Sequence, residues 1–154
     1  MNTERVTFFF YGTLMDAAIC ARVTGMAVTA AKLRPATLEG HRRVRVADRH
    51  YPAITPVPGS RVTGCLFRQV PPKAQRRLAL YEDDTYEAKW VRVSGIGGIK
   101  TMALAFVAGP RMQLTDEEWD YEDWRRRHRR PFLMGLDRWV READKVGTAA
   151  DIRR

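Results

Sequence analysis

The sequence predicts an α+β fold, and three observations support this prediction. An apolar aromatic run, VTFFFY, stands near the N-terminus and ends at a glycine, as a short buried strand does. Two later segments alternate apolar and polar residues, and near the C-terminus apolar residues recur at helical spacing instead. Because strands and helices are mixed without regular alternation, an α+β arrangement is favoured over a doubly wound parallel sheet.

The N-terminal half contains three predicted strands and one helix. The predicted elements are a buried strand over 6–11, a short helix over 16–23 that ends near Gly25, and strands over 36–46 and 62–70. The segment HYPAITPVPG, residues 50–59, holds three prolines. Since proline has no N–H to donate to a sheet, we expect a loop or an irregular sheet edge there.

The C-terminal half contains a hairpin and three predicted helices. Pro71-Pro72 opens the first helix, and strands over 89–93 and 100–107 flank the turn SGIGG. Thr115 and Glu118 have the spacing of a capping box, which predicts a helix through about His128 that Pro131 ends. A last amphipathic helix follows, with one apolar face formed by Phe132, Leu133, Leu136, Trp139, Val140 and Ala143.

Length and charge limit the possible classes. A chain of 154 residues most simply forms one domain, residues 1–154, with 115–145 as its C-terminal helices. The net charge is +9, and part of the excess lies in RRRHRR, residues 125–130. Such an excess attracts nucleic acid, acidic membranes or small acidic metabolites, although a solvated basic helix face explains the run more simply.

Several kinds of protein are not expected. The sequence shows no signal peptide and no apolar stretch near the roughly 20 residues that a membrane span needs. Cys20 and Cys65 form neither a disulfide framework nor a metal-binding spacing, so a cytoplasmic location is the default expectation. The three histidines lie far apart in sequence, and no phosphate-binding loop or nucleophile motif is present. We therefore expect no metal, no cofactor and no covalent nucleophile.

The corner after the first strand is the first candidate for chemistry. Gly12 permits a positive φ angle and a close approach of a ligand to the main chain, and Thr13 adds a hydroxyl. Free N–H groups at the start of the following helix would favour an anion or a developing oxyanion. An ordinary strand-to-helix turn is the alternative interpretation.

The second candidate is the segment LALYEDDTYEAKWVRV, residues 78–93. Glu82 stands where the proline-started helix should end, next to Asp83 and Asp84. Neighbouring negative charge and partial burial both raise the pKa of a carboxyl group, as general acid–base catalysis at neutral pH requires. The alternative is an acidic, solvated helix end.

Five segments, in order, resemble the γ-glutamylcyclotransferase-like family, which includes the AIG2-like proteins. FFFYGTL is similar to its Tyr-Gly-Ser/Thr-Leu signature, YPAITP to its Tyr-Pro-Ala loop and VTGCLFRQV to one of its strands. LALYEDDTYEAKWVRV resembles its glutamate-containing segment, and WDYEDWRRRH resembles the tryptophan-rich helix of AIG2-like members. The resemblance extends from about Val6 to His128.

The resemblance implies a fold and a set of site residues. The family fold is a small, partly open mixed β-barrel with peripheral helices. Glu82 would be the catalytic acid/base, and the substrate-binding residues would be Tyr11, Gly12, Thr13, Leu14 and Tyr86. The chain departs from the family pattern at Asp83-Asp84, where glycine usually follows the glutamate, and at Ala88, where a basic residue usually stands.

The resemblance also implies an activity. A γ-glutamyl amide would be cyclised to 5-oxoproline with release of an amine or amino acid, within γ-glutamyl or glutathione metabolism and without a cofactor. The enzyme would be a lyase or an acyltransferase acting on a small γ-glutamyl substrate, with no specific nucleic acid and no membrane as partner. A γ-glutamyl acyltransferase relative and a non-catalytic basic module for polyanions stay open as alternatives. The leaving group and the oligomeric state do not follow from the sequence.

Overall fold

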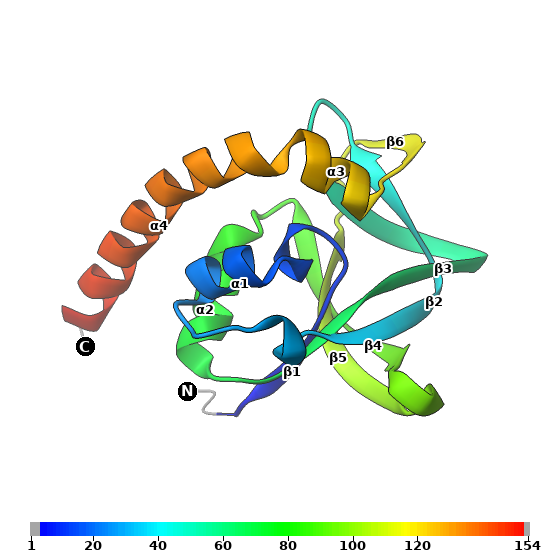
Figure 1. The fold of residues 1–154 in the computed structure, drawn as a ribbon, viewed down its shortest axis with the longest axis horizontal. Coiled ribbons are helices and arrows are strands. Elements are labelled where there is room, and N and C mark those ends of the chain that lie inside the picture. Colours follow the sequence, from blue (N-terminus) through cyan, green and yellow to red (C-terminus); the bar gives the residue numbers. More distant parts are fainter. Residues whose placement is uncertain (1–3, 153–154) are drawn as a thin grey trace. The chain divides into compact units, whose positions relative to one another are not determined.

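The computed structural model describes the backbone of residues 4–152 and the side chains of residues 4–146. The chain forms two compact units, Met1–Asp120 and Tyr121–Arg154. The first unit is built on six strands (Figure 1): β1 (Val6–Phe10), β2 (Arg34–Val46), β3 (Pro52–Val70), β4 (Tyr86–Ser94), β5 (Lys100–Ala108) and β6 (Leu114–Glu118). The second unit consists of the helices α3 (Tyr121–Arg127) and α4 (Arg129–Ile152). The prediction of a single domain over the whole chain stays a prediction.

Five of the strands close into a barrel. The order of neighbours is β3-β1-β5-β4-β2, and β2 pairs with β3 to complete the ring. The sheet is mixed because β1 and β5 run parallel while the other neighbours are antiparallel. Two strand pairings are short, with one residue pair each: β1 pairs with β5 at Phe8↔Leu104, and β2 pairs with β4 at Thr37↔Ser94. The predicted α+β class with a partly open mixed barrel is therefore confirmed.

The aromatic run of β1 lies in the core of the barrel unit. Phe8, Phe9 and Phe10 are all buried, and Phe9 belongs to the central apolar cluster with Tyr11. Close packing of β1 on β3 depends on Gly64, where a Cβ atom would lie 2.2 Å from the carbonyl oxygen of Phe10. β1 is thus fixed on β3 immediately before the corner that follows it.

The helices of this unit begin and end as predicted. After the 3₁₀ turn η1 (Thr13–Met15), helix α1 (Ala17–Thr24) starts at Asp16, whose carboxylate accepts a hydrogen bond from the Ile19 N–H at 3.1 Å. It stops at Gly25, which adopts the left-handed conformation with φ 74°. Helix α2 (Pro72–Tyr81) starts at the proline pair. Of two further 3₁₀ turns, η2 (Ala30–Lys32) lies between α1 and β2, and η3 (Ile96–Gly98) connects β4 to β5.

The proline-rich segment is a strand, contrary to the sequence prediction. β3 begins at Pro52 and continues through all three prolines; Pro52 and Pro56 pair with β2, whereas Pro58 lies at a shift in the register of the two strands. The Val46 N–H donates to Tyr51 O, so alternate pairs further along, Arg45↔Pro52 and His41↔Pro56, are the non-hydrogen-bonded ones. Proline costs no ladder hydrogen bond at these positions, which is why the strand tolerates it.

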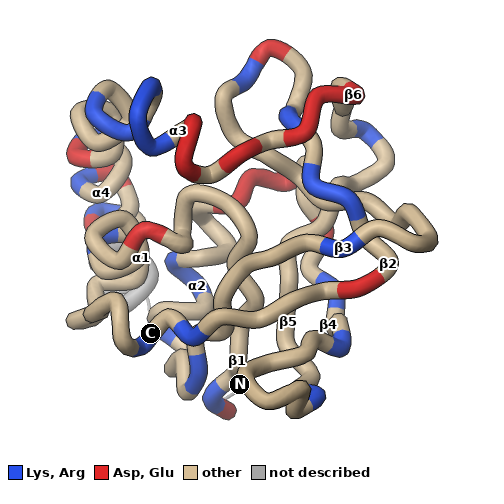
Figure 2. Tube along the Cα trace, turned by 45° about the vertical axis from the view of Figure 1, so that its right-hand side comes forward, with Lys and Arg blue, Asp and Glu red and all other residues tan. Residues whose placement is uncertain are grey.

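The predicted capping box at Thr115 and Glu118 is also wrong. Both residues belong to β6, and the Thr115 hydroxyl donates to the carbonyl of Arg45 on β2 at 2.9 Å. In Figure 2 the acidic β6 lies alongside basic positions of β2, and Arg45 forms an ion pair with Glu117. Opposite charges across the two strands stabilise a pairing that the capping-box spacing does not reveal.

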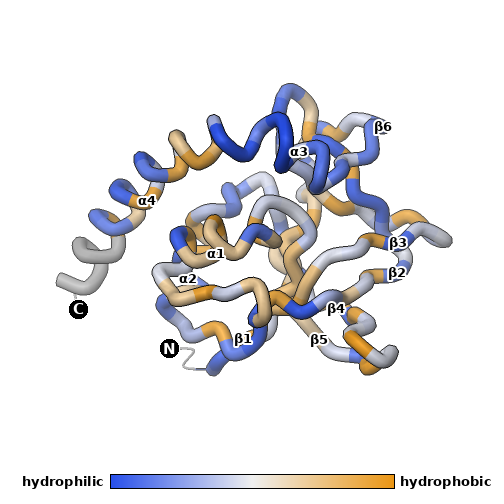
Figure 3. Tube along the Cα trace, viewed as in Figure 1, coloured by the Kyte–Doolittle hydropathy of each residue, from blue (hydrophilic) through white to orange (hydrophobic). Residues whose placement is uncertain are grey.

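The C-terminal unit starts at Tyr121 rather than at residue 115. Pro131 lies in the first turn of α4 and does not end the preceding helix, which stops at Arg127. The Trp124 ring meets the Phe132 ring edge-on, with centroids 5.4 Å apart. The predicted last amphipathic helix lies within α4, and Figure 3 shows that α3 is strongly hydrophilic. Of the helices in the described part of the chain, none is both long and apolar enough to cross a membrane.

Candidate active site

Glu82 ends helix α2 at the C-cap position. Its N–H donates to Leu78 O at 3.0 Å, and its φ and ψ of −81° and 117° turn the chain from helix to extended structure. The side chain is half-buried, and its carboxylate makes no hydrogen bond or ion pair with any residue that the structure describes. Burial raises the pKa of Glu82 to about 8, and the negative charge of Asp83 adds to this effect. The predicted carboxyl group with a raised pKa is therefore present.

Three tyrosines share the surroundings of Glu82. Burial is the main cause that raises the pKa of Tyr11, Tyr81 and Tyr86, and the charge of Glu82 raises each of them further. The charge of Tyr51 also acts on Tyr81 and Tyr86. The structure thus brings Tyr11, from the N-terminal segment, close to Glu82 and Tyr86, which lie four residues apart in the sequence.

The two aspartates after Glu82 differ in their contacts. Asp83 accepts hydrogen bonds from the N–H of Thr85, at 2.8 Å, and from its hydroxyl, which fixes the turn into β4. Asp84 is exposed and lies 3.5 Å from Arg111. Of these two aspartates, only Asp83 raises the pKa of Glu82, in addition to the larger effect of burial. Ala88 lies exposed on β4.

Gly12 is needed for space rather than for a positive φ. Its φ and ψ are −127° and −136°, so the predicted use of the left-handed region is wrong. A Cβ atom at this position would lie 3.0 Å from Cγ and 3.2 Å from Cδ of Pro52. The corner therefore packs its bare backbone against the proline ring.

Two backbone N–H groups at the corner are used in local hydrogen bonds, and three others are not. The N–H of Met15 donates to Gly12 O, and that of Asp16 donates to Thr13 O. Within the described residues, the N–H groups of Gly12, Thr13 and Leu14 donate to no backbone acceptor. The binding of an anion or an oxyanion by these three consecutive amides stays a prediction.

Thr13 and Leu14 are both buried, and Thr13 joins the corner to helix α2. The Thr13 hydroxyl lies 2.7 Å from the Tyr81 hydroxyl, one residue before Glu82. This contact ties the corner to the end of the helix that carries the carboxyl group. The Thr13 hydroxyl already has a protein partner, so the backbone is the better donor to a ligand.

Sequence reasoning missed two residues that hold this region together. The carbonyl of Pro52 accepts a hydrogen bond from the Tyr86 hydroxyl at 2.7 Å, while the Pro52 ring lies against Gly12. Arg43 donates to the Tyr11 carbonyl at 2.9 Å. The YPAITP motif was the available signal for Pro52, whereas no local signal distinguishes Arg43 from the other arginines of β2.

The remaining candidates for chemistry are engaged elsewhere or buried. Cys20 and Cys65 are free and buried, and burial raises the pKa of each thiol to about 12. In the part of the chain that the structure describes, no group of three His, Cys, Asp or Glu side chains is arranged to hold a metal ion. Three arginines of the basic run form ion pairs within α3: Arg125 with Glu122, and Arg126 and Arg127 with Asp123.

Comparison with known proteins identifies the family of the chain. Residues 8–126 match the family model for gamma-glutamyl cyclotransferase, AIG2-like proteins. The chain belongs to this family. AIG2-like protein A of Arabidopsis thaliana is 28% identical over 130 residues, which cover 81% of this chain and 75% of that protein.

Solved structures extend the likeness to the fold. A protein of Arabidopsis thaliana solved in solution matches with a TM-score of 0.62 and 25% identity, over 88% of this chain and 91% of its own. A gamma-glutamyl cyclotransferase matches with a TM-score of 0.55 and 13% identity, over 72% of this chain and 70% of its own, which shows the shared fold alone. The predicted membership of the AIG2-like cyclotransferase family is confirmed.

Proposed function

We propose that this protein is a γ-glutamyl cyclotransferase that converts a small γ-glutamyl amide into 5-oxoproline and a free amine or amino acid. One observation carries the proposal: Glu82 is half-buried, its carboxylate has no hydrogen-bond or ion-pair partner among the described residues, and its pKa is raised to about 8. A carboxyl group without a structural partner costs stability in such a place, so its retention favours a chemical role.

The reaction needs one proton carrier. The substrate's α-ammonium group gives a proton to the Glu82 carboxylate, and the resulting amine attacks its own γ-carbonyl carbon. A C–N bond forms and the carbonyl becomes an oxyanion. When the oxyanion collapses, the bond to the leaving nitrogen breaks, and protonated Glu82 gives its proton to that nitrogen. The released amine takes the second proton from the ring nitrogen and leaves as an ammonium ion, and the Glu82 carboxylate is regenerated. Atoms and charge therefore balance without a cofactor in this scheme.

The corner at Gly12 supplies the complementary group. The N–H groups of Gly12, Thr13 and Leu14 would donate to the developing oxyanion or to the substrate's carboxylate. Because the amine and the carbonyl belong to one molecule, the enzyme must only hold the rotamer in which the five-membered ring closes. Tyr86 and Tyr11, both close enough to respond to the charge of Glu82, would line the cavity.

The raised pKa suits both halves of the cycle. A carboxyl group with a pKa of about 8 is mostly in its acid form at pH 7, and roughly a tenth of the molecules carry the carboxylate that accepts the proton. An ordinary exposed glutamate would be a weaker base toward an ammonium group. Burial is the main cause of the shift, so the chemistry depends on how α2 ends against the barrel.

The test is a screen of γ-glutamyl amino acids and γ-glutamylamines for release of 5-oxoproline. We expect turnover of at least one compound, and loss of roughly 10²–10⁴-fold in Glu82→Gln, which keeps the size of the side chain and removes the proton carrier. Asp84→Asn is the matched control, because Asp84 is exposed and does not act on Glu82. Full activity of Glu82→Gln would contradict the proposed role.

The same assay separates cyclisation from transfer. An acyltransferase of this fold would pass the γ-glutamyl group to an added amine, which would appear as a new amide in place of 5-oxoproline. Cyclisation as the only outcome in the presence of excess amine supports the proposal. A new amide as the main product would replace it by γ-glutamyl transfer.

A further inference from the structure

The barrel leaves one strand edge without a neighbour. β4 pairs with β5 from Tyr86 to Ser94, but its other edge meets β2 only at Thr37↔Ser94. The later part of β2 pairs with β6 instead. From Tyr86 to Arg92 this edge therefore faces no other strand of the described chain, and we call it the β4 edge. An unpaired edge is a template for pairing with a further strand.

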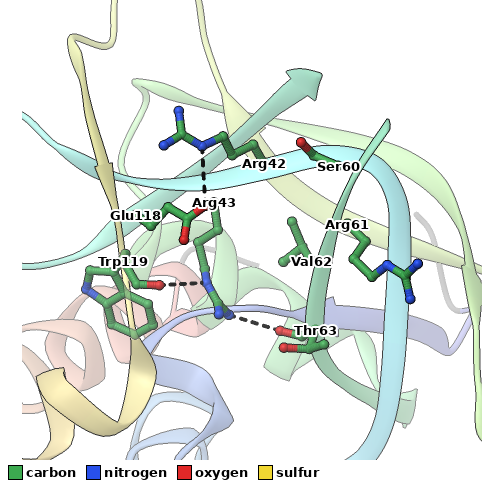
Figure 4. A pocket seen from close by; sticks show the side chains of 8 residues that line it. All are labelled: Arg42, Arg43, Ser60, Arg61, Val62, Thr63, Glu118 and Trp119. Carbon is green, nitrogen blue, oxygen red and sulfur yellow. Dashed lines mark hydrogen bonds and ion pairs between the residues drawn. The ribbon is translucent and has the colours of Figure 1, made fainter. Parts of the chain in front are cut away.

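Where β6 covers β2, the surface is satisfied within the chain. Three arginines line a depression of about 310 Å³ formed by β2, β3 and the end of β6 (Figure 4). Arg42 lies 3.8 Å from Glu118, and Arg61, with a side chain 71% exposed, lies 4.0 Å from Glu39. Arg43 donates to three backbone carbonyls, and two nearby carboxylates act on its charge. This covered side needs no further partner, whereas the β4 edge has unused backbone groups.

The backbone groups of β4 alternate in direction. The Gly109 N–H donates to Thr85 O at 2.9 Å, and the Gly95 N–H donates to Ile99 O at 2.8 Å, at the two ends of the β4–β5 pair. Odd-numbered residues of β4 therefore direct their N–H and C=O groups toward β5, and even-numbered residues direct theirs away from it. At Ala88 both groups face the open side, with no backbone partner among the described residues.

The side chains of the β4 edge are exposed and carry both signs of charge. The side chains of Glu87 and Lys89 are 45% and 61% exposed, and they lie 3.5 Å apart. Trp90, in the middle of the strand, is 58% exposed. Lysine alone on an edge repels a second copy, which is one way in which natural proteins prevent strand pairing. A glutamate two residues from the lysine instead allows opposite charges to meet.

We propose that the β4 edge pairs antiparallel with the β4 edge of a second copy of this chain, with Ala88 on the two-fold axis. Glu87 of each copy then lies opposite Lys89 of the other, so that four charges alternate in sign across the axis. This pair occupies a non-hydrogen-bonded position, where opposed side chains lie closest. Trp90 lies opposite Tyr86 of the second copy. The contact is self-complementary, as a two-fold dimer requires.

Charge selects this register over its neighbours. With Lys89 or Glu87 on the axis, that residue would face its own copy, which sets like charges against each other. With Trp90 on the axis, Lys89 would face Val91 and Glu87 would face Val93, and the ion pairs would be lost. Of these alignments, only the proposed one opposes unlike charges. The pairing lies within the barrel unit and does not depend on the proposed enzymatic activity.

Sedimentation velocity of the whole protein at increasing concentration tests the pairing. The salt concentration is about 0.15 M, which screens the repulsion between two chains of charge +9. We expect a reversible monomer–dimer equilibrium. Ala88→Pro removes the N–H at the axis without removing a bond to β5, so it should abolish the dimer. Ala88→Ser keeps the N–H and should dimerise like the wild type. A wild type that stays monomeric at every concentration, or a dimer that persists in Ala88→Pro, would overturn the proposal.

Charge exchange tests the register, and it stays informative if Ala88→Pro fails to fold. Glu87→Lys leaves positive charge at both positions and Lys89→Glu leaves negative charge at both, so each variant alone should dimerise roughly tenfold more weakly. In an equimolar mixture the two variants oppose unlike charges, so a mixed dimer should form with the strength of the wild type. Lys73→Glu is the matched control, because Lys73 is an exposed lysine on α2, and it should not weaken the dimer. A mixture that dimerises no better than its components would contradict the register.

Discussion

The Glu82 site and the β4 edge use charge in opposite ways. Glu82 is half-buried among tyrosines, and its carboxylate has no hydrogen-bond or ion-pair partner in the described part of the chain, so burial raises its pKa to about 8. On the β4 edge, Glu87 and Lys89 have side chains 45% and 61% exposed and lie 3.5 Å apart. Burial prepares the first region for proton transfer, whereas solvent access leaves the charges of the second available to another copy of the chain.

Tyr86 is the residue that the two regions share. Its phenol responds to the charge of Glu82 and donates to Pro52 O, and its backbone begins β4. Loss of the Tyr86 ring would therefore disturb both regions together. Glu82 and Lys89 share no contact within the described residues, so changes at these two positions can separate effects on the two regions.

The largest expected effect tests this separation directly. Glu82→Gln should lower 5-oxoproline release by roughly 10²–10⁴-fold and leave self-association intact. Lys89→Glu should weaken self-association roughly tenfold and leave the chemical step intact. Turnover assays and sedimentation on the same preparations measure both quantities. If each variant lowered both quantities equally, the two regions would be one site and the comparison would fail.

A smaller loss is expected when the corner is filled. Gly12→Val places a branched Cβ where the Pro52 ring lies 3.0 Å away, which must displace the ring or the three amides of the corner. We expect turnover to fall roughly tenfold or more, since a displacement of about 1 Å can cost as much as 10² in rate. Thr13→Ser keeps the hydroxyl that contacts Tyr81 and should cost far less.

The control for this prediction is thermal stability. Both proteins must show a cooperative melt before their turnover is compared. Equal turnover losses in the two folded variants would mean that the close approach of Gly12 and Pro52 does not organise the site.

The sequence predicted the parts of these regions that local chemistry determines. β1, the Asp16 cap, the Gly25 stop and the proline start of α2 each depend on residues next to one another, and all are present. Glu82 at the end of α2 follows from the same local signals. The prediction of a positive φ at Gly12 was wrong. Glycine is needed there because the Pro52 ring lies close, and Pro52 is too far away in the sequence for the residues around Gly12 to reveal this contact.

The errors share a physical cause. Pro52 and Pro56 in β3 are tolerated because they pair with β2 at non-hydrogen-bonded positions, and acidic side chains of β6 face arginines of β2. Both depend on the register of strand pairing, which propensity and capping rules do not contain. The depression lined by β2, β3 and the end of β6 was missed for the same reason, because its residues come together only when these strands pair.

A stability measurement tests the burial of Glu82. The folded-state pKa of about 8 lies above the ordinary value of 4.5, so the folded protein holds this proton more tightly than the unfolded chain does. Stability contributed by protonated Glu82 is therefore lost as pH rises from about 4.5 to about 8. Glu82→Gln should melt at the same temperature as wild type near pH 4, and at a clearly higher temperature near pH 9. If the difference in melting temperature between Glu82→Gln and wild type does not grow with pH, Glu82 is exposed to solvent, as Arg61 is.

The contribution of like charge is smaller than that of burial and separates Asp83 from Asp84. Asp83→Asn removes a negative charge near Glu82 while keeping an acceptor for Thr85, so the rise of kcat/KM with pH should move to lower pH by less than about one unit. Asp84→Asn should not move it, because Asp84 does not act on Glu82. Equal displacements in the two pH–rate profiles would show a general charge effect in place of a local one.

The smallest effect is expected at Tyr86, whose hydroxyl is used in a structural hydrogen bond. Tyr86→Phe removes the hydroxyl that donates to Pro52 O and leaves the ring in place, so the free energy of unfolding should fall by about 1 kcal/mol. The Pro52 ring, which limits space at Gly12, would then be held less firmly, and KM should rise a few-fold with little change in kcat. A large fall in kcat at unchanged stability would instead make the Tyr86 hydroxyl a direct participant in proton transfer beside Glu82. Self-association through the β4 edge should not change in either case, because Tyr86→Phe keeps the backbone of β4 and the ring that would face Trp90 of the second copy.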